Sequence, residues 1–322
     1  MMQWKSKGLV TLGAAVLAAC GGGGSSPTST PAPAETRLAL SAANQQAAAR
    51  VAMTAIDFSL GAADMGSGRR SALASPTRRQ ALAVRPLAVV GPDATVPCPK
   101  GGSIVISLED ANRNGSLDQG DTLSTELRAC NSDEGLISGK LVASVREFSS
   151  SQFSTRVVMS LDVQNLSTQL ANGDQQTGNG SFMVTLQDTG TGVSTVLVEA
   201  PRFELSGRRA GQTYSTQVSQ LRVQTQDEAN RVPQQTLLNA SATQIQSSEF
   251  GGLSVSLQTD PDFSILAGDI YPSSGAALVQ GAGGSRIRLV ALNAQQVRVD
   301  LDANGDGSYE SNATYNWPLL GP

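Results

Sequence analysis

Hydrophobic and polar residues alternate with a period of two through most of the second half of the chain. Apolar side chains occupy every second position within 157–163 and within 182–186. This pattern is typical of strands that bury one face and expose the other. Similar runs occur at 103–108, 123–130, 137–148, 193–205, 214–226, 235–246, 253–258, 285–291 and 296–301.

Turn-forming residues separate these runs, which predicts hairpin connections instead of helical crossovers. The expected turns are Asn172-Gly173, Asn179-Gly180, Gly190–Gly192, Gly251-Gly252 and Gly281–Gly284. About a dozen strands joined in this way form an antiparallel meander, which must curl, close or split into layers. We therefore predict a mainly β domain over 97–322, as a curved sheet, an open barrel or a sandwich.

The segment before this domain has a different pattern. Apolar residues from Leu38 to Leu60 are separated by three, four or seven positions, which predicts an Ala-rich helix over 36–65, starting as early as Ala34. The helix has one moderately apolar face, interrupted at Gln45 and Gln46, and glycines mark its end. Residues 66–96 combine five arginines with small residues and prolines, so they are expected to form a basic, extended linker. The arginines either contact anionic lipid or lipopolysaccharide or only keep the linker solvated.

The first 20 residues follow the pattern of an export signal. Lys5 and Lys7 precede an apolar run over 9–19, which is too short for a membrane span of roughly 20 residues. Leu17-Ala18-Ala19-Cys20 resembles the lipobox of bacterial lipoproteins. The resemblance implies that 1–19 is a lipoprotein signal peptide, cleaved before Cys20, and that this cysteine is acylated.

The residues after Cys20 are typical of the segment that tethers a lipoprotein to its membrane. Residues 20–35 are rich in Gly, Ser, Thr and Pro and are expected to form a flexible tether. Two or three acyl chains would hold the protein stably to a membrane. In Gram-negative lipoproteins an aspartate after the acylated cysteine resembles an inner-membrane retention signal. Gly21 occupies that position, which favours the outer membrane if the organism has one.

Two cysteines remain after Cys20. In an exported protein, Cys98 and Cys130 are expected to form one disulfide. Free thiols or half of a metal site are the alternatives, although other soft ligands are lacking.

Charge and composition exclude several functions. Cleavage before Cys20 removes two lysines and no acid, leaving 21 basic and 27 acidic residues and a formal charge of −6, which argues against a nucleic-acid partner. The chain contains no histidine, which removes the Ser-His-Asp arrangement and the commonest zinc ligand. Its acids are scattered through turns, with no pair placed for glycoside hydrolysis. We predict that the protein is not an enzyme.

One acidic turn resembles the calcium loop of an EF-hand. That loop needs oxygen ligands at its first, third and fifth positions, glycine at the sixth and acids later. The matching residues here are Asp110, Asn112, Asn114, Gly115, Ser116, Asp118 and Asp121. The last acid is aspartate where glutamate is usual, and the flanks predict strands instead of helices. A calcium site and a turn closed by Asx hydrogen bonds both fit this sequence.

A second, weaker match begins at either Asp300 or Asp302. Its candidate ligands are Asp300, Asp302, Asn304, Asp306 and Glu310, and neither frame places an acid at the twelfth position. Residues 313–319 follow it as a final strand that would bury Trp317. The two turns and the tryptophan are similar to those of uncharacterised proteobacterial envelope lipoproteins, a resemblance that implies no activity.

Three functions remain open from the sequence. The first is a non-catalytic envelope lipoprotein that binds a protein or glycan partner or stabilises the envelope, with Ca²⁺ stiffening its acidic turns. The second is a carrier of a lipid or another apolar ligand, which requires an enclosed apolar cavity of several hundred Å³. The third is a carbohydrate-binding or polysaccharide-acting module, for which exposed aromatic residues are scarce.

Overall fold

The computed structural model describes residues 36–67, 93–116, 118–131, 135–170, 172–228 and 230–320. The expected signal peptide, Cys20, the tether over 20–35 and residues 68–92 of the linker lie outside these ranges. Within them the chain forms one long helix, three short 3-10 helices and fifteen strands. The helices are α1 Gln45–Ser67, η1 Ser248–Phe250, η2 Ala282–Gly284 and η3 Trp317–Leu319.

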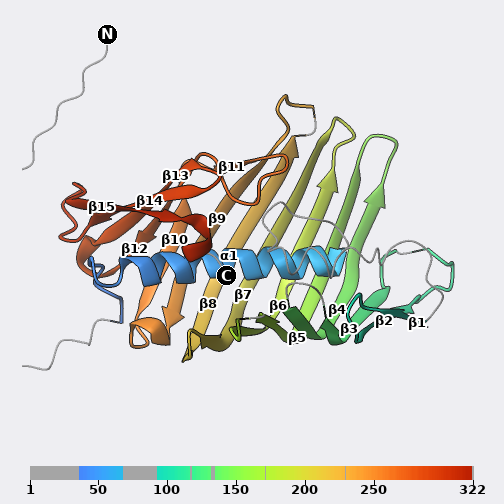
Figure 1. Ribbon diagram of the computed structural model, residues 1–322. Helices are drawn as coiled ribbons and strands as arrows, with labels where there is room; N and C mark the ends of the chain where they lie inside the picture. The colour runs from blue at the N-terminus through green and yellow to red at the C-terminus, as the bar shows by residue number, and fades with distance from the viewer. Residues whose placement is uncertain are drawn as a thin grey trace, which may run out of the picture. The chain divides into compact units, whose positions relative to one another are not determined.

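The strands belong to one antiparallel sheet. They are β1 Asp93–Pro97, β2 Ser103–Glu109, β3 Thr122–Asn131, β4 Gly135–Ser150, β5 Thr155–Leu170, β6 Gln175–Asp188, β7 Val193–Arg209, β8 Gln212–Glu228, β9 Gln235–Ser247, β10 Ser254–Thr259, β11 Phe263–Leu266, β12 Ala276–Gln280, β13 Arg286–Asn293, β14 Gln296–Asp302 and β15 Ser311–Asn316. Their spatial order follows the sequence from β1 to β10 and from β12 to β15, while β11 pairs with β9. The predicted meander is confirmed, as a curved sheet that does not close into a barrel (Figure 1).

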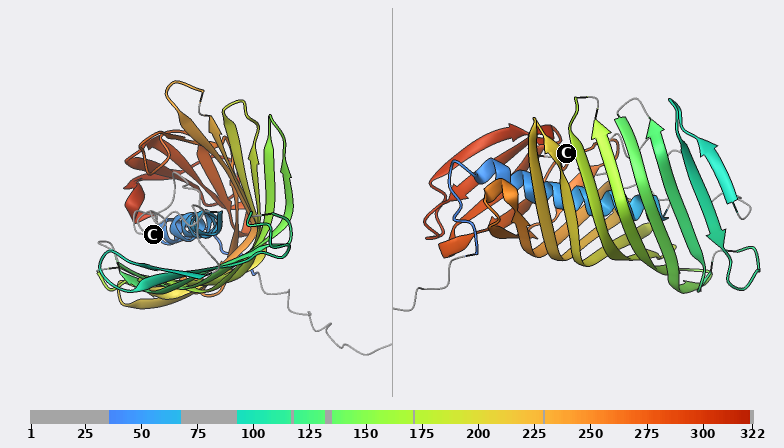
Figure 2. Two further views of the ribbon diagram at one scale, coloured as in Figure 1. Left: turned by 90° about the vertical axis from the view of Figure 1, so that its right-hand side faces the viewer. Right: turned by 90° about the horizontal axis from the view of Figure 1, so that it is seen from below.

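The sheet curves around α1, which lies along its concave face (Figure 2). The helix contacts strands from β4 to β9 and from β12 to β14. Side chains from Val51 to Asp64 are buried, so the helix is enclosed on all sides instead of on one moderately apolar face. Small alanines at four of these positions allow neighbouring elements to approach the helix closely.

An aromatic cluster joins the helix to the middle of the sheet. Phe58 of α1 stacks on Phe203 of β7 with ring centroids 5.7 Å apart, and Phe182 of β6 lies 5.3 Å from Phe203. Gly178 lies directly beneath Phe58, where a Cβ atom would be 2.0 Å from the ring. The close packing of helix and sheet therefore depends on this glycine.

The prediction of a turn at Asn179-Gly180 is wrong, because both residues lie inside β6. Gly180 is needed there for close packing, since a Cβ atom would lie 2.5 Å from Cβ of Phe203. The strand pairing shifts register between Gly180 and Met183, and β4 and β5 have similar bulges. Such bulges bend strands and increase their twist, which helps the sheet to curve around α1.

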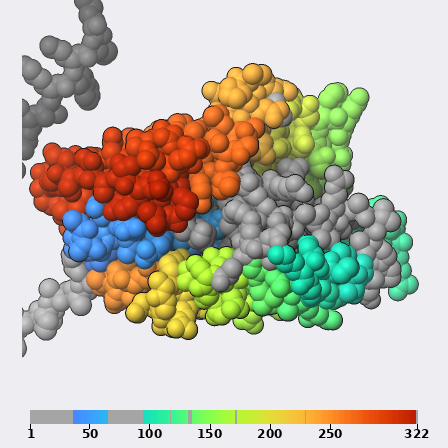
Figure 3. Space-filling view, viewed as in Figure 1, coloured from blue at the N-terminus to red at the C-terminus, as the bar shows by residue number. Residues whose placement is uncertain are grey.

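The helix begins later than the sequence pattern indicates. Residues 36–40 are extended, with Leu38 N–H donating to the Ser254 carbonyl at 2.8 Å and Ser254 N–H donating to the Thr36 carbonyl at 2.9 Å. The Leu38 carbonyl accepts a further bond, from Ala282 N–H at 2.8 Å. Because β10 and η2 use these backbone groups, the segment cannot form helical hydrogen bonds. Figure 3 shows this blue N-terminal region between the C-terminal strands and the strands around β9.

The ends of the β domain also differ in detail from the prediction. β1 begins at Asp93, inside the segment assigned to the linker. The expected disulfide is present between Cys98 and Cys130, with Cα atoms 5.4 Å apart, and it joins the end of β1 to β3. At the other end Trp317 is buried as expected, directly after β15, and its indole N–H donates to the carbonyls of Pro272 and Asn293.

Candidate functional site

The first acidic loop joins β2 to β3 and is closed by hydrogen bonds between its own residues. The Asp110 carboxylate accepts a bond from Gly115 N–H at 2.7 Å, which is the main cause of its lowered pKa. The fully buried Asp121 carboxylate accepts bonds from Ala111 N–H at 2.9 Å and Asp118 N–H at 2.8 Å. The first and last acids of the predicted calcium loop are therefore directed toward backbone N–H groups.

Asparagine amides surround the remaining acid of this loop. Asn112 Nδ2 donates to both oxygens of Asp118 at 2.9 Å, and Asn114 Nδ2 donates to the same carboxylate. Ser116 N–H in turn donates to Asn114 Oδ1 at 2.7 Å. Since Ca²⁺ takes oxygen ligands, both amides would have to turn before an ion could bind. The arrangement is the Asx network that the sequence left as the alternative to calcium.

The second acidic loop joins β14 to β15 and brings three carboxylates together. Asp302, Asp306 and Glu310 each place one oxygen within 4.8 Å of the other two. Ligand oxygens at about 2.4 Å from one Ca²⁺ are separated by up to about 4.8 Å, so the three acids are close enough to share an ion. Among the described residues the acids of the first loop do not form such a group. The weaker match in sequence is thus the better candidate in space.

Hydrogen bonds hold the carboxylates of the second loop in place. Asp302 is fully buried and accepts bonds from Gly305 N–H at 2.7 Å and Gly307 N–H at 2.9 Å. Arg286 of β13 donates to the same carboxylate from Nε at 2.9 Å. The pKa of Asp306 is lowered, first by the hydrogen bond from Ser308 N–H. One guanidinium therefore already offsets part of the negative charge that would attract a cation.

The structure selects one of the two frames considered for this loop. Asp300 lies within β14, where Arg298 donates to its two oxygens at 2.6 and 3.0 Å. It is therefore not a member of the acidic group, and the geometry favours the frame that begins at Asp302. In the remaining frame, Asn304 connects the loop internally by donating from Nδ2 to Asp306 at 3.1 Å.

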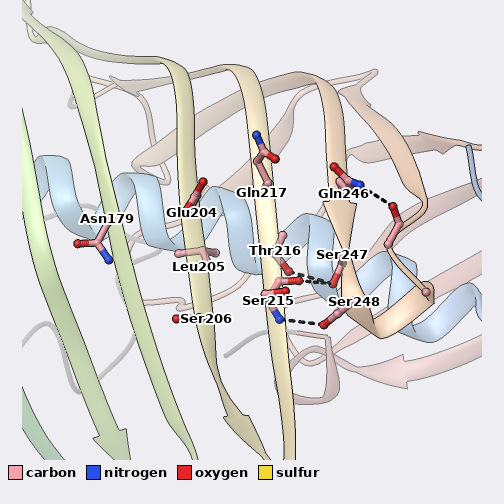
Figure 4. A pocket seen from close by; sticks show the side chains of 12 residues that line it. Asn179, Glu204, Leu205, Ser206, Ser215, Thr216, Gln217, Gln246, Ser247 and Ser248 are labelled. Carbon is pink, nitrogen blue, oxygen red and sulfur yellow. Dashed lines mark hydrogen bonds between the residues drawn. The ribbon is translucent and has the colours of Figure 1, made fainter. Parts of the chain in front are cut away.

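A polar hollow lies on the outer face of the sheet, opposite α1 (Figure 4). Its volume is about 490 Å³, and strands β6 to β9 and the β9–β10 turn form its walls. Asn179, Glu204, Gln217 and Gln246 are aligned in register across the four strands. Neighbouring strands are about 4.8 Å apart, so this row extends about 14 Å. The residues of this hollow are far apart in the chain, so their local sequence does not predict it.

A second row of polar side chains lies beside the first. Ser206 of β7 is opposite Ser215 of β8, whose N–H donates to Ser248 Oγ at 2.9 Å. The hollow therefore presents hydroxyls along one side and amides with one carboxylate along the other. The sequence clue to it is the polar residue at alternate positions of each strand.

The concave face of the sheet is where a carrier of an apolar ligand would be expected to hold it. α1 and the aromatic cluster around Phe58 occupy the part of this face formed by β6 and β7. An apolar ligand carried there would have to displace the helix. This packing does not favour a carrier at that position.

Within the described residues, none of the helices has the length and apolar character needed to span a bilayer. Comparisons with protein-family models, curated proteins and solved structures returned no match to this chain.

Proposed function

We propose that this chain is a lipid-anchored protein of the bacterial cell envelope whose β domain is a non-catalytic binding or structural module. The Cys98–Cys130 disulfide is the observation that supports this proposal most strongly. Disulfides persist in oxidising compartments outside the cytosol, which agrees with the export pattern of residues 1–19. Pairing of these two cysteines leaves Cys20 as the third cysteine of the chain, in the lipobox-like position.

The number of residues between Cys20 and the folded domain supports a short attachment of the domain to the membrane. Residues 36–40 are hydrogen-bonded to β10 and η2, and Thr36 follows Cys20 by 16 positions. A flexible chain of that length has a typical end-to-end distance of about 20–24 Å and a maximum of about 55 Å. Anchoring at Cys20 would therefore keep the β10 end of the domain close to the membrane.

We also propose that Ca²⁺ binds weakly to the second acidic loop and stiffens the β14–β15 connection. The close approach of Asp302, Asp306 and Glu310 supports this metal, because Ca²⁺ prefers carboxylate oxygens. The ion pair between Arg286 and Asp302 lowers the expected affinity, since a cation already neutralises one ligand. Extracellular calcium sites with dissociation constants of about 0.1–1 mM are the appropriate comparison.

Cell fractionation tests the anchor. We expect the wild-type protein in the membrane fraction, where high salt does not release it, because acyl chains bind by the hydrophobic effect. The Cys20→Ser variant should lack the acyl chains and lose this attachment. Cys98→Ser is the matched control, since it changes a cysteine outside the lipobox and should leave the protein in the membrane fraction. Membrane attachment that is equal in wild type and Cys20→Ser would refute the anchor.

A further inference from the structure

Hydrogen bonds within the protein hold the side chains of the first polar row of the hollow, Asn179, Glu204, Gln217 and Gln246, in the absence of a ligand. Asn165 N–H donates to Asn179 Oδ1 at 2.7 Å, and Gln246 Nε2 donates to the Gly252 carbonyl at 2.7 Å. Arg202 donates to Glu204 at 2.8 Å. With its amide oxygen toward Arg202, Gln217 also accepts bonds from that guanidinium, at 3.0 and 2.9 Å. Preorganisation of this kind reduces the entropy lost on binding.

These contacts leave both donors and acceptors available for a ligand. Asn179 retains its amide N–H groups, Glu204 retains its second oxygen, and Gln246 retains its amide oxygen. The hydroxyl of Ser206 adds a group that can donate and accept. Such a mixture matches a ligand whose own groups both donate and accept hydrogen bonds, and sugar hydroxyls have this property.

Other ligand classes fit the hollow less well. An anion would need a free positive group, but Arg202 is engaged with Glu204 and Gln217. A cation would find a single carboxylate that the same arginine neutralises. Peptides commonly bind β proteins by adding a strand at a sheet edge, whereas β7 and β8 are paired on both sides in the middle of this sheet.

We infer that the hollow on the outer face of β6 to β9 binds a short segment of an uncharged saccharide. The volume of about 490 Å³ is within the usual range for small-molecule sites. Ser247 and Ser248 line the hollow and lie close to Ser254, where residues 36–40 dock. A saccharide bound there is held at the end of the domain that faces the membrane, a placement that rests on the proposed lipid anchor. The saccharide itself is recognised by the hollow alone.

The test uses the full-length protein in a detergent whose head group contains no sugar. Isothermal titration calorimetry measures binding of a neutral trisaccharide of N-acetylated amino sugars, a neutral hexose trisaccharide and an acidic uronic-acid trisaccharide. We expect one molecule of a neutral trisaccharide to bind per chain, with little binding of the acidic one. The two neutral ligands distinguish a cell-wall type of glycan from a hexose polymer.

Variants locate the binding to the hollow. Ser206→Trp should fill the hollow and abolish binding, while Glu204→Gln and Gln217→Ala should each weaken it about three- to tenfold. Matched controls are Ser149→Trp, on an exposed part of β4, and Gln187→Ala, on an exposed part of β6 outside the hollow. Both controls should bind as the wild type does.

Three results would overturn the inference. The first is the absence of saturable binding of either neutral trisaccharide at about 10 mM, a concentration at which even millimolar affinity is visible. The second is binding that Ser206→Trp leaves unchanged, and the third is preferred binding of the acidic trisaccharide. A protein found acylated at Cys20 that binds no sugar refutes this inference alone. One that binds sugar but is not acylated refutes the anchor alone.

Discussion

Replacement of Gly178 by alanine should destabilise the domain by forcing α1 away from the sheet. The added Cβ atom would lie 2.0 Å from the Phe58 ring, so the ring would have to retreat by about 1.4 Å to reach a 3.4 Å contact. Phe58 is stacked on Phe203 and lies on a buried helix, which limits such a movement. We expect a loss of about 2–4 kcal/mol, between the cost of overpacking and that of losing a buried phenylalanine.

The double variant provides a sharper test of this packing. Phe58→Ala alone should cost about 3–5 kcal/mol, because it leaves a cavity. In the Phe58→Ala/Gly178→Ala variant the new methyl group enters that cavity, so the loss should be no larger than for Phe58→Ala alone. The two substitutions should therefore be strongly non-additive.

Urea unfolding of the full-length chain, followed by tryptophan fluorescence, measures these free energies. Gln187→Ala is the control, since it changes an exposed residue on the same strand and should alter stability by less than about 0.5 kcal/mol. A Gly178→Ala variant as stable as this control would show that the helix does not pack on β6 as described. Additive losses in the double variant would lead to the same conclusion.

Three further predictions concern the loops and the disulfide. Ca²⁺ at about 5 mM should raise the melting temperature of wild type but not of Glu310→Gln, because binding stabilises the folded state. An equal rise in both proteins would exclude the second acidic loop as the calcium site. Reduction of the Cys98–Cys130 disulfide removes a cross-link between positions 32 residues apart in the chain, so the free energy of unfolding should fall by about 3–4 kcal/mol. An unchanged free energy of unfolding on reduction would contradict this. The lowered pKa values of Asp110 and Asp306 predict stability that is present above the ordinary carboxyl pKa of 3.8 and is lost as pH falls further. Asp306→Asn should reduce the loss of unfolding free energy at acid pH, measured by urea unfolding as a function of pH. If the variant matched wild type below pH 4, Asp306 would not be a source of this pH dependence.

Local alternation was sufficient to predict most strands, because each strand of an open sheet has one buried and one exposed face. β6 illustrates this, with Phe182 and Val184 buried and Met183 between them exposed. β11 and β12 were not predicted, since they have four and five residues and too few alternations to detect. β1 was missed because Asp93–Pro97 follows a proline- and arginine-rich segment and resembles its continuation.

The remaining errors arise from contacts between distant parts of the chain. The apolar spacing at 36–40 fits a helix, but Ser254 and Ala282 bind its backbone in an extended form. Asn179-Gly180 has the sequence of a hairpin turn, but the fold requires Gly180 beside Phe203. Neither partner can be identified from local sequence.

Spacing alone could not show which of the two acidic loops brings its acids together. It placed possible ligands at suitable positions in the first loop but gave no information on hydrogen bonds that turn the Asn112 and Asn114 amides toward Asp118. In the second loop it could not tell that Asp300 pairs with Arg298. The polar positions of each strand were visible in the sequence, but the hollow could not be located from them, because the register of four strands aligns its residues.

The most direct test of the proposed function is mass spectrometry of the N-terminal peptide from protein purified out of membranes. We expect a peptide that begins at Cys20 and has the added mass of a thioether-linked diacylglycerol, with or without an amide-linked acyl chain. A peptide that retains residues before Cys20, or one that begins at Cys20 without lipid, would contradict the assignment of this chain as an envelope lipoprotein.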